Sequence, residues 1–112
     1  MHTIDHPKIL EQQQRFAFGK NWSRFLKYLT EDRILEAEKS LVDNLGLQDL
    51  KGKTFLDVGS GSGLFSLAAH RLGATAFSFD YNQDSVNCTQ SLKENYGNKD
   101  QAWSVQQGSV LD

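Results

Sequence analysis

The sequence predicts an α/β fold, a parallel sheet of about three strands with flanking helices, preceded by N-terminal helices. Two observations lead to this prediction. Apolar residues recur at helical spacing up to about residue 45, and short apolar runs then alternate with helical segments in the order strand, helix, strand, helix, strand. A glycine-rich turn also joins the first strand to its helix. Such alternation is typical of parallel strands joined by right-handed crossovers.

Composition limits the possible classes of protein. A chain of 112 residues allows one domain at most. A single cysteine, Cys88, excludes an intrachain disulfide and fits a reducing compartment. The net charge of −2 gives no support to nucleic-acid binding, which usually requires a basic excess. No apolar run reaches the roughly 20 residues that span a membrane. We therefore expect a cytoplasmic protein with no membrane partner.

The first domain segment, residues 1–50, is expected to be helical. Residues 1–12 form a polar lead-in, and spaced apolar residues predict a helix over 22–29. Thr30 can cap a second helix over 31–45, and Gly46 can end it. Its apolar stripe consists of Ile34, Leu35, Ala37, Leu41, Val42 and Leu45. The aromatic residues Phe16, Phe18 and Trp22 fit either a core or a lid over a ligand.

The second segment, residues 51–112, carries the predicted sheet. Strands are expected at 54–58, 75–79 and 102–107. The helices between them run from Leu64 to about Leu72 and from Asn82, as the cap, to Tyr96. His70 is expected on a helix surface, and Cys88 as a small helix residue with no nucleophilic role. The three histidines lack the spacing of metal ligands, so no metal is predicted.

The stretch FLDVGSGSGLF carries glycine at 59, 61 and 63 between a strand and a helix. Glycine allows a sharp turn and a close ligand approach, and the helix start offers free N–H groups. The spacing does not fit the dinucleotide fingerprint G-x-G-x-x-G. Asp57 precedes the loop, where a carboxylate would oppose a pyrophosphate but suit an ammonium group. The loop therefore favours a ligand without phosphate.

A second acid, Asp80, closes the second strand. A carboxylate at this place can accept hydrogen bonds from the two hydroxyls of a ribose. A glycine loop with such an acid indicates a nucleoside ligand, and Asp57 favours a nucleoside with a cationic amino-acid tail. S-adenosylmethionine has both features and no phosphate.

LDVGSGSG followed by FSFDYN resembles the first two motifs of class I, Rossmann-like S-adenosylmethionine-dependent methyltransferases. The resemblance covers about residues 53–112. It implies that Asp57 approaches the methionine amino group and that Asp80 holds the ribose hydroxyls. It further implies that the loop residues Gly59, Ser60, Gly61 and Gly63 lie against the methionyl part.

The adenine contacts are the remaining implication of the resemblance. Tyr81 stands where the family often packs a side chain on the adenine ring. VQQGSVLD resembles the third motif, in which a residue after the glycine contacts the adenine amino group. The usual acid at that place is replaced by Ser109, and the backbone of Val110 is a further candidate.

The resemblance implies a methyltransferase that acts on an unidentified acceptor. The family's fold has seven strands, so we expect this chain to be an incomplete domain, a fragment inactive alone, that can self-associate through an exposed sheet edge. No catalytic residue can be named from the sequence. Two alternatives stay open: an NAD-dependent oxidoreductase or epimerase half-domain, and a non-catalytic nucleotide-binding or interaction module.

Overall fold

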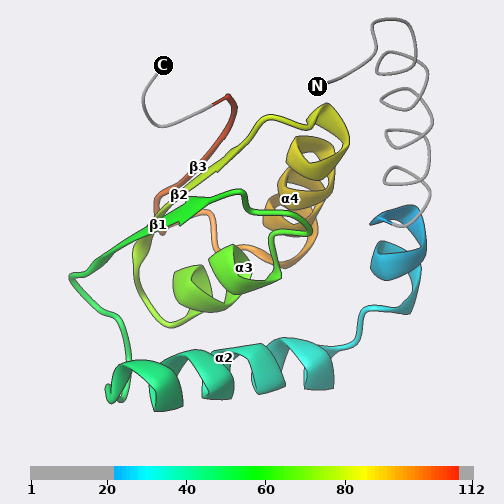
Figure 1. Ribbon diagram of the computed structural model, residues 1–112. Coiled ribbons are helices and arrows are strands. Elements are labelled where there is room, and N and C mark those ends of the chain that lie inside the picture. Colours follow the sequence, from blue (N-terminus) through cyan, green and yellow to red (C-terminus); the bar gives the residue numbers. More distant parts are fainter. Residues whose placement is uncertain (1–21, 109–112) are drawn as a thin grey trace, which may run out of the picture.

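The computed structural model describes residues 22–108, so the predictions for Phe16, Phe18, Ser109 and Val110 lie outside the described residues (Figure 1). The chain is helical over residues 22–28. The elements that follow are α2 (Glu31–Leu45), β1 (Thr54–Val58), α3 (Leu64–Arg71), β2 (Thr75–Asp80), α4 (Gln83–Tyr96) and β3 (Trp103–Gln107). The predicted order of helices and strands is confirmed.

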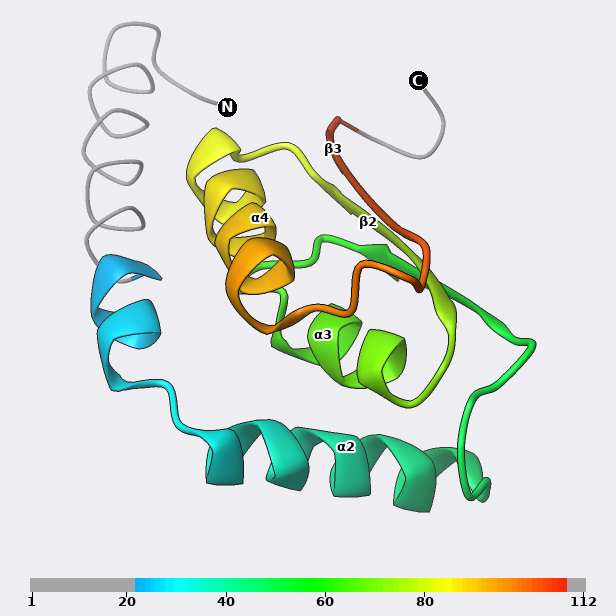
Figure 2. The ribbon, with the colours of Figure 1, turned by 180° about the vertical axis from the view of Figure 1, so that it is seen from behind.

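The three strands form one parallel sheet in the order β1-β2-β3. Its register aligns Leu56 of β1 with Phe77 of β2, and Phe77 with Ser104 of β3. Helices α3 and α4 both pack on one face of the sheet, as the two opposite views show (Figure 1, Figure 2). The predicted α/β class, a partial Rossmann-like sheet with flanking helices, is thus confirmed.

The core lies between the sheet and these two helices. Strand residues alternate between the two faces of a sheet, and Ala76, Ser78 and Trp103 point toward the helices and are buried. Leu67 of α3 and Leu92 of α4 are fully buried against them. This packing fixes both crossover helices and, with them, the loop that precedes α3.

Helix α2 packs against α3 through small and branched side chains, among them Ala37, Leu41, Ala68 and Ala69. Thr30 caps α2 by accepting a hydrogen bond from the Arg33 amide at 3.3 Å. Arg71 of α3 forms ion pairs with Glu31 and Glu38 of α2. The predicted stripe is only partly buried, because Leu35 and Leu45 are 49% and 50% exposed.

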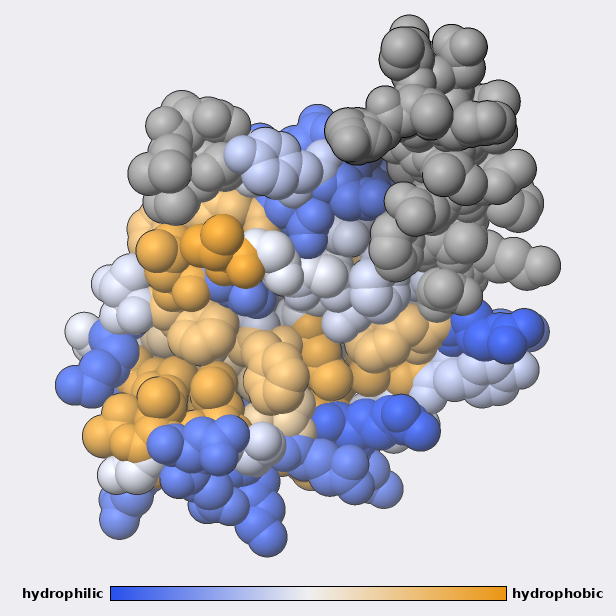
Figure 3. Space-filling model, in the orientation of Figure 1, coloured by the Kyte–Doolittle hydropathy of each residue, from blue (hydrophilic) through white to orange (hydrophobic). Residues whose placement is uncertain are grey.

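The other sheet face carries apolar side chains with no covering element among the described residues. Leu56 is 53% exposed, Val58 58% and Phe77 36%. Strand β1 pairs only with β2 in residues 22–108, so its outer edge keeps unpaired backbone groups. The space-filling view shows apolar surface on the side where β1 lies and near the C-terminal end of α2 (Figure 3).

The expectation that His70 lies on a helix surface is wrong. Its side chain is 2% exposed and packs against the Trp103 ring, with ring centroids 5.0 Å apart. His70 Nε2 accepts a hydrogen bond from the Asn98 amide at 2.7 Å. The helical spacing of α3 did not predict that His70 is buried. The loop of residues 97–102, which follows α4, covers the face of α3 that carries His70, and spacing within α3 carries no information about that loop.

Candidate functional site

The segments that carry the predicted motifs meet at the carboxyl edge of the sheet. The amides of Gly59 and Ser60 donate to the Phe79 carbonyl, at 2.8 and 3.1 Å. Gly61 donates its amide hydrogen to Asp80 Oδ2 at 2.9 Å. The Gly108 amide donates to the Asp80 carbonyl at 2.8 Å. The end of β2 therefore holds the glycine loop on one side and the glycine of the third motif on the other.

The glycine loop has a backbone that other residues would strain. Gly59, Gly61 and Gly63 have φ angles of 77°, 59° and 87°, in the region that favours glycine. A Cβ added at Gly59 would meet nothing within 4 Å, so this side of the loop is open to a ligand. Gly63 is the N-cap of α3 and has no side chain to cap it, and the first amide of the helix, that of Leu64, donates to Ser62 Oγ at 3.3 Å.

Asp57 lies on β1 with its side chain toward α3. Its Oδ2 accepts a hydrogen bond from Ser66 Oγ at 2.5 Å. Oδ1 accepts none from the described part of the chain. The carboxylate is half-buried, so Oδ1 can accept a hydrogen bond from a cationic group of a ligand.

Asp80 does more than the sequence indicated. Besides Gly61, which bonds its Oδ2, the Asn82 amide donates to its Oδ1 at 2.9 Å. Asp80 thus fixes the glycine loop and the start of α4. A carboxylate oxygen has two lone pairs, so each oxygen can still accept a hydroxyl.

Tyr81 directly follows Asp80 and is 71% exposed. Its carbonyl accepts a hydrogen bond from Gln107 Nε2 at 3.1 Å. No ring contact involving Tyr81 is seen within residues 22–108, so its ring is open to a planar ligand. Because the Gly108 amide bonds the Asp80 carbonyl, the glycine of the third motif lies close to this tyrosine.

Trp22, for which the sequence allowed a place either in a core or in a lid over a ligand, lies against the glycine loop. A Cβ added at Gly61 would lie 3.8 Å from the Trp22 ring. Trp22 Nε1 donates to Ser85 Oγ of α4 at 3.1 Å. The helical residues 22–28 therefore reach the glycine loop, a contact across 39 or more positions that local spacing cannot reveal.

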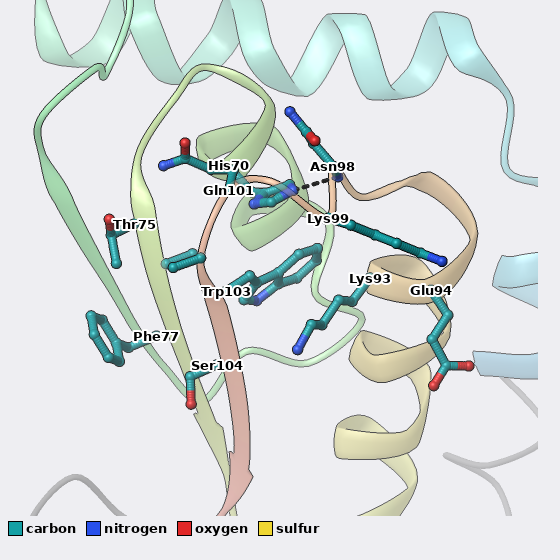
Figure 4. Close-up of a pocket in the computed structure, with 12 residues that line it drawn as sticks. His70, Thr75, Phe77, Lys93, Glu94, Asn98, Lys99, Gln101, Trp103 and Ser104 are labelled. Atoms are coloured by element: carbon teal, nitrogen blue, oxygen red, sulfur yellow. Dashed lines mark hydrogen bonds between the residues drawn. The ribbon is translucent and has the colours of Figure 1, made fainter.

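A pocket of about 480 Å³ lies away from this site, along β3 and near the amino ends of β2 and β3. Figure 4 shows His70, Trp103 and Lys93 among the residues that line it. It does not include Asp57, Asp80 or the glycine loop. Residues 22–108 also hold no group of three or more metal-ligating side chains.

Cys88 lies in α4 and is buried, as expected of a small helix residue. Burial raises the pKa of its thiol to about 11. Since the thiolate is the nucleophile, a raised pKa gives no support to a nucleophilic role for this cysteine. None of the described helices is both long and apolar enough to cross a membrane.

A partial Rossmann-like sheet with a glycine loop after its first strand defines the general class of this chain. The sequence model of the ribosomal protein L11 methyltransferase (PrmA) family matches residues 38–110. A ribosomal protein L11 methyltransferase from Helicobacter hepaticus (strain ATCC 51449 / 3B1) is 35% identical over 110 residues, which cover 88% of this chain. The chain belongs to this methyltransferase family, and the class I resemblance is confirmed.

The matched region is 34% of the Helicobacter protein. The chain thus spans about a third of the length of the curated relative it matches.

Proposed function

We propose that the site at the carboxyl edge of β1 and β2 binds S-adenosylmethionine, and that the protein transfers its methyl group to an acceptor. The observation that carries the proposal is the arrangement of Asp57 and Asp80 around a glycine loop that is open at Gly59. Family membership supports the reaction class.

Each residue of the site has a distinct part in the proposed binding. Asp57 Oδ1 accepts a hydrogen bond from the ammonium group of the methionine tail. Asp80 accepts hydrogen bonds from the ribose hydroxyls. The open side of the loop at Gly59 admits the part of the ligand that links the ammonium group to the ribose. Tyr81 covers the adenine, with Ser109 and Val110 as proposed contacts of the adenine edge. The cofactor supplies a methyl group on a sulfonium sulfur, and the protein's part is to orient it.

A dinucleotide is the main competing ligand. Its diphosphate would have to approach a loop beside the Asp57 carboxylate, whose charge repels it. The loop also lacks the third glycine of the dinucleotide fingerprint. A module that binds the nucleoside without turnover is the third possibility, and it predicts the same binding but no methylation.

The binding test is an NMR titration of isotope-labelled chain with S-adenosylhomocysteine and, separately, with NAD. We expect the amide signals of Gly59, Gly61 and Tyr81 to shift with the adenosyl ligand. Asp57→Asn and Asp80→Asn should each weaken this binding about 10-fold or more, because a hydrogen bond to a charged group contributes roughly 1.5–3 kcal/mol. Asp43→Asn, an exposed change of equal charge on α2, is the control.

Preference for NAD, or no shift at millimolar adenosyl ligand, would contradict the proposal. The Helicobacter relative is named for ribosomal protein L11, so ribosomal protein L11 is the first acceptor to offer in a methylation assay. Such an assay of the full-length protein with labelled cofactor separates an enzyme from a binding module.

A further inference from the structure

A chain of three hydrogen bonds crosses the core and ends on Asp57. Trp103 Nε1 on β3 donates to Ser78 Oγ on β2 at 2.9 Å. Ser78 Oγ donates to Ser66 Oγ on α3 at 2.6 Å, and Ser66 Oγ donates to Asp57 Oδ2 on β1 at 2.5 Å. Ser66, Ser78 and Trp103 are 0%, 1% and 4% exposed. A dry polar path thus joins the far strand to the acid of the candidate site.

The direction of this path is fixed by its donors. An indole N–H can only donate, and a serine hydroxyl has one hydrogen to give. Ser78 accepts a hydrogen bond from Trp103 and donates one to Ser66. Ser66 in turn donates a hydrogen bond to Asp57. Every hydroxyl in the path is satisfied, and the last acceptor is a carboxylate oxygen.

A path with this polarity constrains the Asp57 carboxylate. Hydrogen bonds to a charged acceptor are shorter and stronger than neutral ones, and aligned bonds in a buried chain polarise one another. Oδ2 is therefore held on Ser66, which prevents rotation of the carboxylate. Oδ1 remains the oxygen for a ligand.

We propose that Ser66 and Ser78 are positioning residues that hold Asp57 so that Oδ1 accepts the ammonium group of the adenosyl ligand. This inference rests on the proposed function. It assigns the two serines to the amino-acid end of the ligand and not to its nucleoside end, which Asp80 and Tyr81 contact.

Two ligands that differ only at that end test the inference. S-adenosylhomocysteine carries the ammonium and carboxylate groups, whereas methylthioadenosine has the same nucleoside without them. Ser66→Ala should weaken binding of S-adenosylhomocysteine about 10-fold, the equivalent of roughly 1.4 kcal/mol, because the carboxylate loses its fixed orientation. Binding of methylthioadenosine should stay within about two-fold, an affinity change that corresponds to roughly 0.4 kcal/mol.

Ser78→Ala should give the same selectivity with a smaller loss, since Ser66 still reaches Asp57 but is no longer polarised. This variant also serves if Ser66→Ala reduces the folded fraction. Ser104→Ala, on β3 but outside the path, is the matched control and should change neither affinity. Equal losses for both ligands would reduce the serines to a structural role, and no loss in either variant would also overturn the inference. If the unaltered chain binds neither ligand, the proposed function fails instead.

Discussion

At the scale of single residues, His70 is a buried base that the fold keeps neutral. Burial, followed by the positive charge of Lys93, lowers the pKa of His70 below its ordinary value of 6.5. Its Nε2 must be unprotonated to accept the Asn98 amide. Protonation would turn Nε2 into an N–H donor that faces the N–H donor of Asn98. The fold therefore favours neutral His70 in two independent ways.

This arrangement predicts a loss of stability in acid. A lowered pKa in the folded state means that the unfolded chain binds the proton more readily. The contribution of His70 is complete above the unfolded pKa of about 6.5 and is lost as pH falls from there toward the lower folded pKa. One proton changes the free energy of unfolding by at most about 1.4 kcal/mol per pH unit.

The effect is measured by urea unfolding of the unaltered chain and of His70→Gln between about pH 8 and pH 5. Any difference between the two pH profiles of the unfolding free energy comes from His70, the one residue that differs. His2 and His6 are present in both proteins, so their contributions cancel in the comparison. We expect the difference in unfolding free energy between the two proteins to shrink as pH falls. Parallel pH profiles would contradict the prediction.

Single residues also show what the sequence could and could not predict. The loop glycines and Asp80 could each be chosen as candidates from their immediate sequence context, and the structure brings them into contact. The partners of Asp57 were not found, since Ser66, Ser78 and Trp103 lie on three different elements. One signal was present: Ser78 is a polar residue at an inward position of a strand.

At the scale of elements, the boundaries followed from local rules. Asn82 caps α4 by accepting the amides of Asp84 and Ser85, at 2.8 and 3.2 Å, and Gly46 ends α2 with a φ of 69°. Such caps act within a few residues, so spacing alone reveals them. The buried face of α2 was predicted less well, because that face is set by where α3 lies. Ile34 is buried while its neighbour Leu35 is half exposed.

The glycine loop packs tightly against α4 at Gly63. A Cβ at Gly63 would lie 2.6 Å from Thr89 Oγ1 and 2.9 Å from Thr89 Cα. The latter is backbone and cannot rotate away, and the φ of 87° adds strain for any other residue. We expect Gly63→Ala to lower the free energy of unfolding by about 2–4 kcal/mol, measured by urea unfolding.

Gly52→Ala is the matched control. Gly52 has a similar φ of 75°, but a Cβ there would meet nothing within 4 Å. It should cost only the backbone strain, about 1–2 kcal/mol. Equal losses in the two variants would mean that the contact with Thr89 adds nothing and that α4 yields to the loop.

At the scale of the whole molecule, one face of the sheet is covered and the other has no covering element among residues 22–108. Helices α3 and α4 bury one face, and α2 packs on α3 rather than on the sheet (Figure 2). The uncovered face joins the unpaired edge of β1. The sequence predicted that edge, since three strands in the family's order leave β1 without a second neighbour. It did not predict how much of Leu56 and Val58 would be exposed.

An apolar face beside an open strand edge should associate with the same face of a second copy of the chain. Strand pairing would satisfy the free backbone groups, and burial would remove apolar surface from water. We expect light scattering after size exclusion to give a mass above the 12.6 kDa monomer that increases with concentration. Leu56→Lys, in the middle of β1, should shift the equilibrium toward monomer, since a charge there opposes strand pairing. Leu35→Lys, at a residue of similar exposure on α2, should not. A monomer at every concentration, or equal effects of the two lysines, would show that this face does not drive association.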